Sequence, residues 1–139
     1  MSVGEIRVAI NSDQDIVLAR QKGRSLAAES GFSAVDGTLI ATAISELARN
    51  IVSYAKKGEI LLKTLQESQR KGILIVASDN GPGIPDIRLA LRDGFSTSGS
   101  LGLGLPGVRR LVDEFQIVSS VGQGTVVKVT KWRLDQHEK

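Results

Sequence analysis

The chain has 139 residues, which suits one domain with an ordinary hydrophobic core, so we expect a single domain over residues 1–139. Its composition, 41% hydrophobic and 24% charged, is that of a globular protein and excludes a disordered one, and the absence of cysteine excludes disulfides and thiolate metal sites. A formal charge of +3 with 4% aromatic residues disfavours nucleic-acid binding, and without a signal peptide or a membrane-length apolar stretch we expect a cytoplasmic protein with no membrane partner.

The first half of the chain predicts one strand followed by two helices. Residues 5–10 alternate apolar and polar side chains, which is typical of a strand. Apolar residues at helical spacing predict a helix over 13–30. A second, longer helix is predicted over 33–57, because the Ser33 hydroxyl can cap its start and Gly58 follows as a stop signal.

The second half of the chain predicts four strands and two short helices. Strands are expected at 59–67 and 73–78, and the second is almost entirely apolar, as in a strand that is central in its sheet. Helices are expected at 86–92 and 105–115. Residues 115–132 predict a terminal hairpin, because a turn with two glycines separates two apolar runs.

The order of these elements predicts an α+β fold. We expect a two-layer α/β sandwich in which helices cover one face of a mixed, mostly antiparallel sheet. One region breaks the regular pattern, since positions 81–107 hold seven of the fifteen glycines. Glycine loses more conformational freedom on ordering than any other residue, so this concentration indicates a requirement other than regular secondary structure.

The end of the second helix carries the first candidate site. Glu46 and Asn50 are four residues apart, so they lie on the same side of the helix, at the border between its apolar stripe and the surface. A carboxylate and an amide oxygen in that position could hold a hard cation such as Mg²⁺. An ordinary solvated helix edge would show the same pattern. Arg49 is expected to point away from the core.

The second candidate site directly follows the apolar strand 73–78. Asp79 is held at the strand end, where its carboxylate can accept a hydrogen bond from an exocyclic amine. Gly81 and Gly83 would let the backbone approach a flat ligand closely. A simple Asn-Gly-Pro-Gly turn explains the same residues, and the residues alone favour neither interpretation.

The third candidate site is the segment 94–107, GFSTSGSLGLGLPG, which leads directly into a helix. Successive backbone N–H groups and the positive end of a helix form an anion site, and phosphate is the ligand that fits it. The segment is neither a Walker A loop, since no lysine occurs between 72 and 127, nor a Rossmann turn, since no strand precedes it. A surface loop without function is the alternative.

The order and spacing of these motifs are more specific than any one of them. Residues 46–50 (ELARN), 79–86 (DNGPGIPD), 102–115 (GLGLPGVRRLVDEF) and 122–125 (GQGT) resemble the N, G1 and G2 boxes and the terminal Gly-x-Gly-Thr of the GHKL superfamily, which includes gyrase, Hsp90, histidine kinases and MutL. The short chain is similar to anti-sigma-factor-type serine/threonine kinases, among them the switch kinases of bacterial stressosomes. The resemblance implies the Bergerat ATP-binding fold, with ATP and Mg²⁺ as cofactors.

The resemblance also implies a role for each matching residue. Glu46 would be the general base that takes the proton from the attacking hydroxyl, and Asn50 would bind both Mg²⁺ and ATP. Asp79 would bind the adenine amino group, with support from Thr125. Residues 94–107 would form a lid over the nucleotide. Their glycines would keep this lid mobile when the site is empty and able to touch phosphate when the lid is closed. The other ATP-binding residues that it implies are Gly81, Gly83, Gly102, Leu103, Gly104, Leu105 and Gly107.

The implied function is that of an ATP-dependent protein serine/threonine kinase. Its substrates would be STAS-domain antagonist or scaffold proteins in a bacterial stress-signalling, sigma-factor-regulating pathway, and on release it would also activate a PP2C-type phosphatase. The alternative is a nucleotide-switched anti-sigma factor or binding module without essential phosphotransfer, whose partner would be a sigma factor or a phosphatase. Glu46 favours the kinase. The only histidine, His137, lies near the end of the sequence, so autophosphorylation of the histidine-kinase type is not expected.

Overall fold

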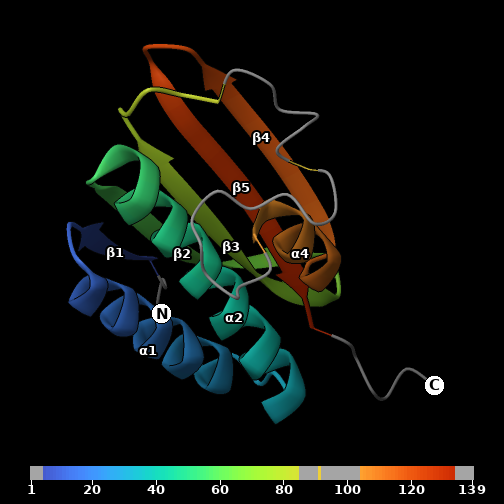
Figure 1. Ribbon diagram of the computed structural model, residues 1–139. Helices are drawn as coiled ribbons and strands as arrows, with labels where there is room; N and C mark the ends of the chain where they lie inside the picture. The colour runs from blue at the N-terminus through green and yellow to red at the C-terminus, as the bar shows by residue number, and fades with distance from the viewer. Residues whose placement is uncertain (1–4, 85–90, 92–103, 134–139) are drawn as a thin grey trace.

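The computed structural model describes residues 5–84, 91 and 104–133, and these form two layers (Figure 1). One layer is a five-stranded sheet, and the other consists of helices that cover one face of it, with α2 between α1 and α4. In chain order the elements are β1 (Glu5–Ile10), α1 (Asp13–Glu29), α2 (Ala34–Asn50), the π-helix η1 (Ile51–Ala55), β2 (Gly58–Glu67), β3 (Arg70–Asp79), α4 (Gly104–Leu111), β4 (Glu114–Ser120) and β5 (Gly124–Trp132).

The sheet has the strand order β1-β2-β3-β5-β4, and all four neighbouring pairs are antiparallel. The predicted α+β sandwich with helices on one face is confirmed, and β3 is the central strand, as its apolar sequence indicates. The described strands contain no parallel pair, so the sheet is antiparallel throughout rather than mixed.

Local side-chain contacts explain where the two long helices begin. The Asp15 carboxylate accepts hydrogen bonds from the backbone N–H groups of Asn11 (2.8 Å) and Ser12 (3.2 Å), just before α1 starts. Ser33 caps α2 as predicted, because its Oγ accepts from the Asp36 N–H at 3.1 Å. Within the described ranges, no helix is long and apolar enough to cross a membrane.

The end of α2 differs from the prediction. Regular α-helix stops at Asn50, a π-helical turn follows, and the chain leaves it at Lys56 with a φ of 74°. Gly58 is therefore not the helix stop but the first residue of β2. Its place is set by the sheet, because it pairs with Asp79 at the end of β3.

Two boundaries in the second half also differ from the sequence expectation. Strand β3 begins at Arg70, so the turn after β2 is only two residues long, shorter than the polar turn that separates the predicted strands 59–67 and 73–78. Helix α4 ends at Leu111 and not at Phe115, because the Asp113 N–H donates to the Thr130 carbonyl (2.9 Å) and so starts the pairing of β4 with β5. The terminal hairpin is confirmed. The helix expected at 86–92 falls outside the described residues, apart from residue 91.

The core lies between the sheet and the helices, and its alternation places the first site residue. On β3 the side chains of Ile73, Ile75 and Ala77 are buried, each two residues from the last. They pack with α2 residues such as Ile44 and Leu47 in one cluster. Because side chains alternate along a strand, the next position on this face is residue 79. The core pattern thus turns the Asp79 side chain toward the helical layer.

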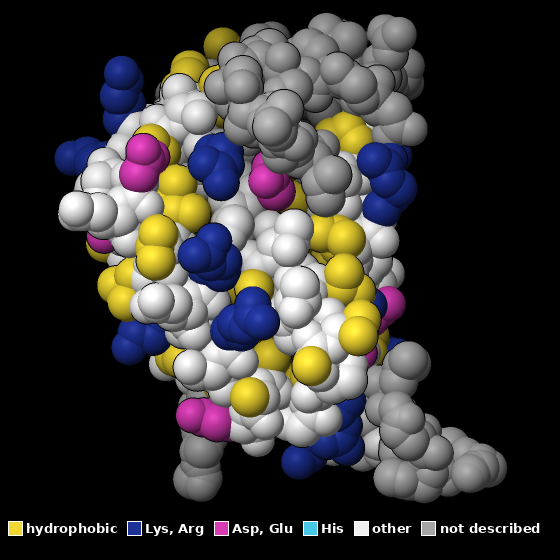
Figure 2. All heavy atoms as spheres, turned by 60° about the horizontal axis from the view of Figure 1, so that its bottom comes forward, with side chains coloured by type: hydrophobic (Ala, Val, Ile, Leu, Met, Phe, Trp, Pro, Cys, Tyr) yellow, Lys and Arg dark blue, Asp and Glu magenta, His cyan; other side chains and the backbone are white. Residues whose placement is uncertain are grey.

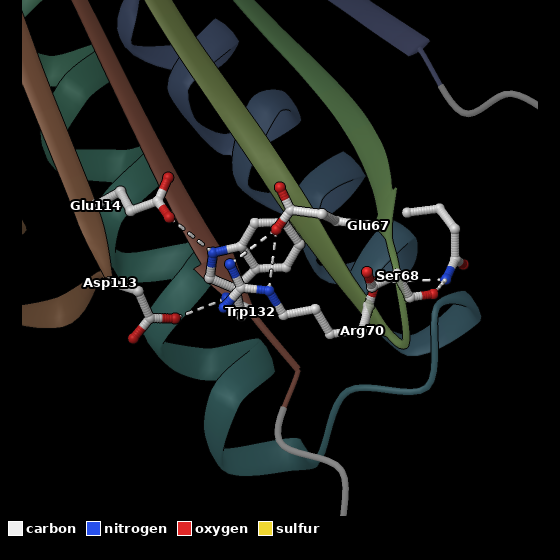
Figure 3. Close-up of polar contacts among 7 residues, drawn as sticks. Glu67, Ser68, Arg70, Asp113, Glu114 and Trp132 are labelled. Atoms are coloured by element: carbon white, nitrogen blue, oxygen red, sulfur yellow. Dashed lines mark hydrogen bonds and ion pairs between the residues drawn. The ribbon is translucent and has the colours of Figure 1, made fainter.

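The opposite end of β3 is fastened by a cluster around Trp132 (Figure 3). Its indole N–H donates to the Glu114 carboxylate (3.0 Å), and its backbone N–H donates to the Asp113 carboxylate (2.6 Å). The Arg70 guanidinium lies 3.7 Å from the ring centroid and is paired with Glu67 at 2.8 Å. The cluster therefore joins the β2–β3 hairpin to the β4–β5 hairpin.

Truncating this cluster should cost stability but not nucleotide binding. We expect Trp132→Ala to lower the free energy of unfolding by about 2 kcal/mol, since the half-buried ring, its cation–π contact and its hydrogen bond are lost together. Denaturant unfolding measures this, and Trp132→Phe, which keeps the ring, should lose less. An unchanged unfolding midpoint for the alanine variant would show that the Trp132 cluster does not stabilise the fold.

Candidate nucleotide and catalytic site

Glu46 lies on the flank of α2 that faces α4, and it is more buried than its predicted border position suggested. Its side chain is 7% exposed, and Oε1 accepts a hydrogen bond from the backbone N–H of Gly104 at 3.3 Å. Gly104 is the first residue of α4 and has a φ of 66°, a conformation that favours glycine. The partial positive charge at the start of a helix stabilises a carboxylate. The contact joins two predicted site residues that are 58 positions apart in sequence.

Asn50 lies one turn after Glu46, at the junction of α2 with the π-helical turn. It is half-buried, and its side-chain amide has no hydrogen-bond partner among the described residues. An amide oxygen in this position is a suitable ligand for Mg²⁺. No group of three His, Cys, Asp or Glu residues converges in the described part of the chain. A cation held by Asn50 would therefore take most of its ligands from phosphate and water.

Asp79 is fixed by the turn that follows it. Its Oδ1 accepts the backbone N–H of Gly81 at 2.8 Å, and no described residue donates to Oδ2, which leaves one carboxylate oxygen for a ligand. Gly81 packs against η1, since a Cβ at this position would lie 2.5 Å from that of Ala55. Glycine at 81 thus serves the packing of the loop, and this packing positions Asp79.

Thr125 lies next to Asp79, because the two residues are directly paired between β5 and β3. Its hydroxyl is 2.8 Å from that of Ser119, which also lies 3.1 Å from the Gly124 carbonyl and accepts the Ile84 N–H at 2.7 Å. The Ser119 proton must go to the carbonyl, so Thr125 is the donor to Ser119. Ser119 escaped the sequence analysis, and its only signal is its position opposite Thr125 in the hairpin.

The loop after Asp79 is also anchored on that hairpin. Gly83 has a φ of 82°, and a Cβ there would collide with the Ser120 carbonyl. The Pro82 carbonyl accepts the Gly122 N–H at 2.8 Å. Gly81 and Gly83, which are predicted to line a site for a flat ligand, are therefore also required by contacts within the protein.

Gly58 is a second residue that sequence reasoning missed. A Cβ at this position would lie 3.0 Å from that of Asp79 and 2.9 Å from Ile51 Cγ2, and it would also meet the Ser78 carbonyl. We expect Gly58→Ala to displace Asp79 and weaken ATP binding about tenfold, with a loss of stability of about 1–3 kcal/mol. Calorimetric titration and thermal unfolding measure the two effects.

Gly37→Ala on α2 is the matched control for this variant. A Cβ at Gly37 meets only Ala27, at 3.9 Å, and alanine favours a helix more than glycine does. The control should keep its ATP affinity and its stability. If Gly58→Ala binds ATP as the control does, Gly58 does not position Asp79.

The lid residues are described only in part. Gly102 and Leu103 lie outside the described residues, whereas Gly104, Leu105 and Gly107 form the start of α4. The Leu105 side chain is buried in the core at 7% exposure, so a contact between Leu105 and a nucleotide would come from its backbone. Gly107 is buried as well.

Arg49 departs from its predicted outward position. Its side chain is half-buried, and its Nε is fully buried without a hydrogen-bond partner. The departure has a geometric reason, since helical periodicity places Arg49 on the flank of α2 nearest to α1, and a neighbouring helix covers what an isolated helix would expose.

A cavity of about 650 Å³ lies at the strand ends beside Asp79. Its wall includes Asp79 and Thr125, but also Ser78, Val118 and Val126. These last three belong to the sheet face opposite the helices, because they alternate with the buried positions of their strands. Glu46 and Asn50 do not line it, so this cavity is distinct from the space between Glu46 and Asp79.

Two groups of known proteins resemble the sequence. The chain is 56% identical over 125 residues to the serine/threonine-protein kinase RsbT of Bacillus subtilis (strain 168), a match that covers 90% of this chain and 94% of that protein. It is 31% identical over 97 residues to the anti-sigma F factor of Caldanaerobacter subterraneus subsp. tengcongensis, covering 67% and 68% of the two chains. The expected likeness to an anti-sigma-factor-type serine/threonine kinase is confirmed.

Solved structures agree on the fold. The RsbU and RsbW domains of a Mycobacterium tuberculosis protein superpose with a TM-score of 0.61 at 21% identity, over 96% of this chain and a third (33%) of that chain. The mycobacterial sensor histidine kinase MprB gives 0.55 at 15% identity, over 94% and 98% of the two chains. The model of the family "Histidine kinase-, DNA gyrase B-, and HSP90-like ATPase" matches residues 35–136. The chain belongs to this family of ATPases.

Proposed function

We propose that this protein is a serine/threonine kinase that transfers the γ-phosphoryl group of ATP to a STAS-domain protein, with Glu46 as the base. The observation that carries the proposal is the buried Glu46 carboxylate, held against the first N–H group of α4. A binder that uses nucleotide only as a switch has no need of a proton acceptor there. The 56% identity to a serine/threonine-protein kinase supports the same activity.

The remaining residues bind and orient ATP. Asp79 would accept the adenine amino group on the carboxylate oxygen that Gly81 leaves free, and the Thr125–Ser119 pair would hold the neighbouring strand end in place. Asn50 would hold Mg²⁺ through its amide oxygen. Bound Mg²⁺ would neutralise phosphate charge. The N–H groups at the start of α4 would face the phosphates.

The transfer step needs positioning and one proton acceptor. The acceptor hydroxyl oxygen forms its bond to the γ-phosphorus while the bond from that phosphorus to the bridging oxygen of ADP breaks. The hydroxyl proton passes to Glu46. Because Gly104 already occupies Oε1, the proton goes to Oε2. The same hydrogen bond fixes the direction in which the carboxylate points.

The substrate and the downstream partners follow from the kinase type. We propose STAS-domain antagonist or scaffold proteins of a bacterial stress-signalling pathway as substrates, a PP2C-type phosphatase as the partner that the kinase activates on release, and the cytoplasm as the location. The RsbU and RsbW domains of the M. tuberculosis neighbour are consistent with such partners.

A second candidate function has its own support. The similarity to anti-sigma F factors favours a nucleotide-switched module that traps a sigma factor. The two functions are separated by mixing the purified protein, γ-labelled ATP and a purified STAS-domain protein. Label on a serine or threonine of the STAS-domain protein supports the kinase. Nucleotide-dependent binding of a sigma factor without any transfer of label would support the alternative and reject the kinase.

A further inference from the structure

Basic side chains form a row across the helical face of the molecule (Figure 2). Between Asp15 and Glu29, helix α1 has no acidic residue, and it presents the exposed Arg20, Lys22 and Arg24. The row lies over α1 and α2, and an acidic side chain lies beside its upper end in Figure 2.

Helix geometry places two of these residues on the flank of α1 that meets α2. The contact between the helices is marked by Gly23, whose position abuts Ile44, and by Ala27, which lies opposite Gly37. Arg20 and Arg24 are within one turn of these contact residues and on the same side of the helix. Lys22 falls on the other flank, away from α2.

Arg49 lies on the facing flank of α2. Beside it, α2 presents Thr38 and Thr42, with the buried Ser45 beneath them, and all three hydroxyls donate back to the carbonyls four residues earlier at 2.9–3.0 Å. These side chains are short and already bonded. The outer surface along the contact between α1 and α2 therefore has short, uncharged side chains with arginines on either side, and we call it the arginine surface.

The three arginines have no ion pair or hydrogen bond with any described residue, whereas Arg7 and Arg70 elsewhere are paired with glutamates. The Nε of Arg49 is buried without a partner. An unsatisfied buried donor is costly, and guanidinium groups pair with carboxylates in a planar, bidentate geometry. In the free protein these arginines thus lack acceptors for their N–H groups within the described part of the chain, and the carboxylates of a partner would supply them.

We propose that the arginine surface, formed by Arg20, Arg24 and Arg49, is the docking site for an acidic segment of the protein that presents the acceptor hydroxyl. This inference rests on the proposed kinase function. Arg49 follows Glu46 by three residues on α2, so a segment that binds the arginines brings the rest of its protein to the side of the catalytic carboxylate. Three separated arginines, few aromatic residues and a net charge of only +3 fit a protein surface better than a nucleic acid or a membrane.

Two independent measurements test whether the arginine surface docks the STAS-domain protein. Binding is measured with ADP present and with a STAS-domain protein whose phosphorylated serine or threonine is replaced by alanine, so that no transfer is needed. Transfer is then measured with the unmodified STAS-domain protein as KM and kcat. The variants are Arg20→Glu, Arg24→Glu and Arg49→Leu, and Lys22→Glu on the other flank of α1 is the matched control.

Each arginine variant should raise both the Kd and the KM for the STAS-domain protein about tenfold or more, because buried arginine contacts are frequent energetic centres of interfaces. ATP affinity should not change, and the control should stay within about twofold. Arg49→Leu should keep or raise the melting temperature of the free protein, since it removes an unpartnered buried donor. A purely structural Arg49 would instead show a lower melting temperature.

Several results would overturn the docking proposal. Unchanged Kd and KM in all three arginine variants is the first, and an equal effect of Lys22→Glu is the second, because the effect would then be general electrostatics. Loss of binding to a DNA duplex or to anionic phosphatidylserine vesicles, with STAS-domain binding intact, is the third. If the unsubstituted protein phosphorylates no STAS-domain protein, the kinase proposal fails. Arginine-dependent binding of that protein in the presence of ADP would still support the docking proposal.

Discussion

Asp79→Asn should weaken the binding of ATP and ADP by about two orders of magnitude, close to abolishing it. The asparagine oxygen can still accept the Gly81 N–H, so the turn keeps its shape. The amide NH₂ then occupies the position of the free carboxylate oxygen and opposes the adenine amino group, donor against donor. Losing a charge-assisted hydrogen bond and leaving a donor unpaired costs about 3 kcal/mol together, which is roughly a hundredfold in affinity.

Isothermal titration calorimetry with ATP and with ADP measures this effect. Asn80→Ala is the matched control, because Asn80 is the exposed neighbour of Asp79 and belongs to the same turn. The control should bind nucleotide normally, and the melting temperatures of both nucleotide-free variants should stay close to that of the original protein. Unchanged ATP affinity in Asp79→Asn would remove Asp79 from the adenine-binding role.

Glu46→Gln should separate chemistry from binding. Glutamine has the same shape, and its oxygen can still accept the Gly104 N–H, so the start of α4 remains in place. ATP affinity should stay within a few-fold, because Asp79 and Asn50 are untouched. Without the proton acceptor, phosphorylation of the STAS-domain protein should fall by about two orders of magnitude, within the range for general-base catalysis.

Asn50→Asp provides the contrast, measured by the same titration and by single-turnover transfer of labelled phosphate. It adds a negative charge beside the triphosphate, so ATP binding and transfer should both decrease. A parallel loss of affinity and rate in Glu46→Gln would make Glu46 a ligand of the metal or of its water. If that variant loses neither, the protein is a nucleotide-switched binding module and the kinase proposal falls.

The sequence predicted the parts of the site that depend on local pattern. The alternation along β3 indicates where the apolar strand ends, and the turn that follows keeps Asp79 at its tip. Helical spacing put Glu46 and Asn50 on one flank of α2. Motif spacing then named the lid, whose helix begins at Gly104 within the described chain.

What sequence could not predict depends on contacts between distant segments. The carboxylate of Glu46 is buried because α4 covers it, and periodicity within one helix carries no information about a second helix. Ser119 matters through its pairing with Thr125 across the hairpin and its bond to the distant Ile84. Phe115 has helical spacing to α4 but lies in β4, since ladder hydrogen bonds outweighed a weak local preference.

The two ends of β3 differ in what a substitution there would disturb, which has consequences for how the protein can change over time. At one end, Asp79 is flanked by Gly58 and Gly124, and neither position has room for a Cβ. At the other end, Trp132 and Arg70 supply bulk and hydrogen bonds, and the one position there without room for a Cβ among the described glycines, Gly72, abuts the Trp132 ring and not a site residue. Mutational drift should therefore be tolerated and compensated at the Trp132 end, where stability can be gained or lost in small steps, while the glycine-lined end stays nearly invariant. An engineer seeking a hardier variant would work at the Trp132 end alone.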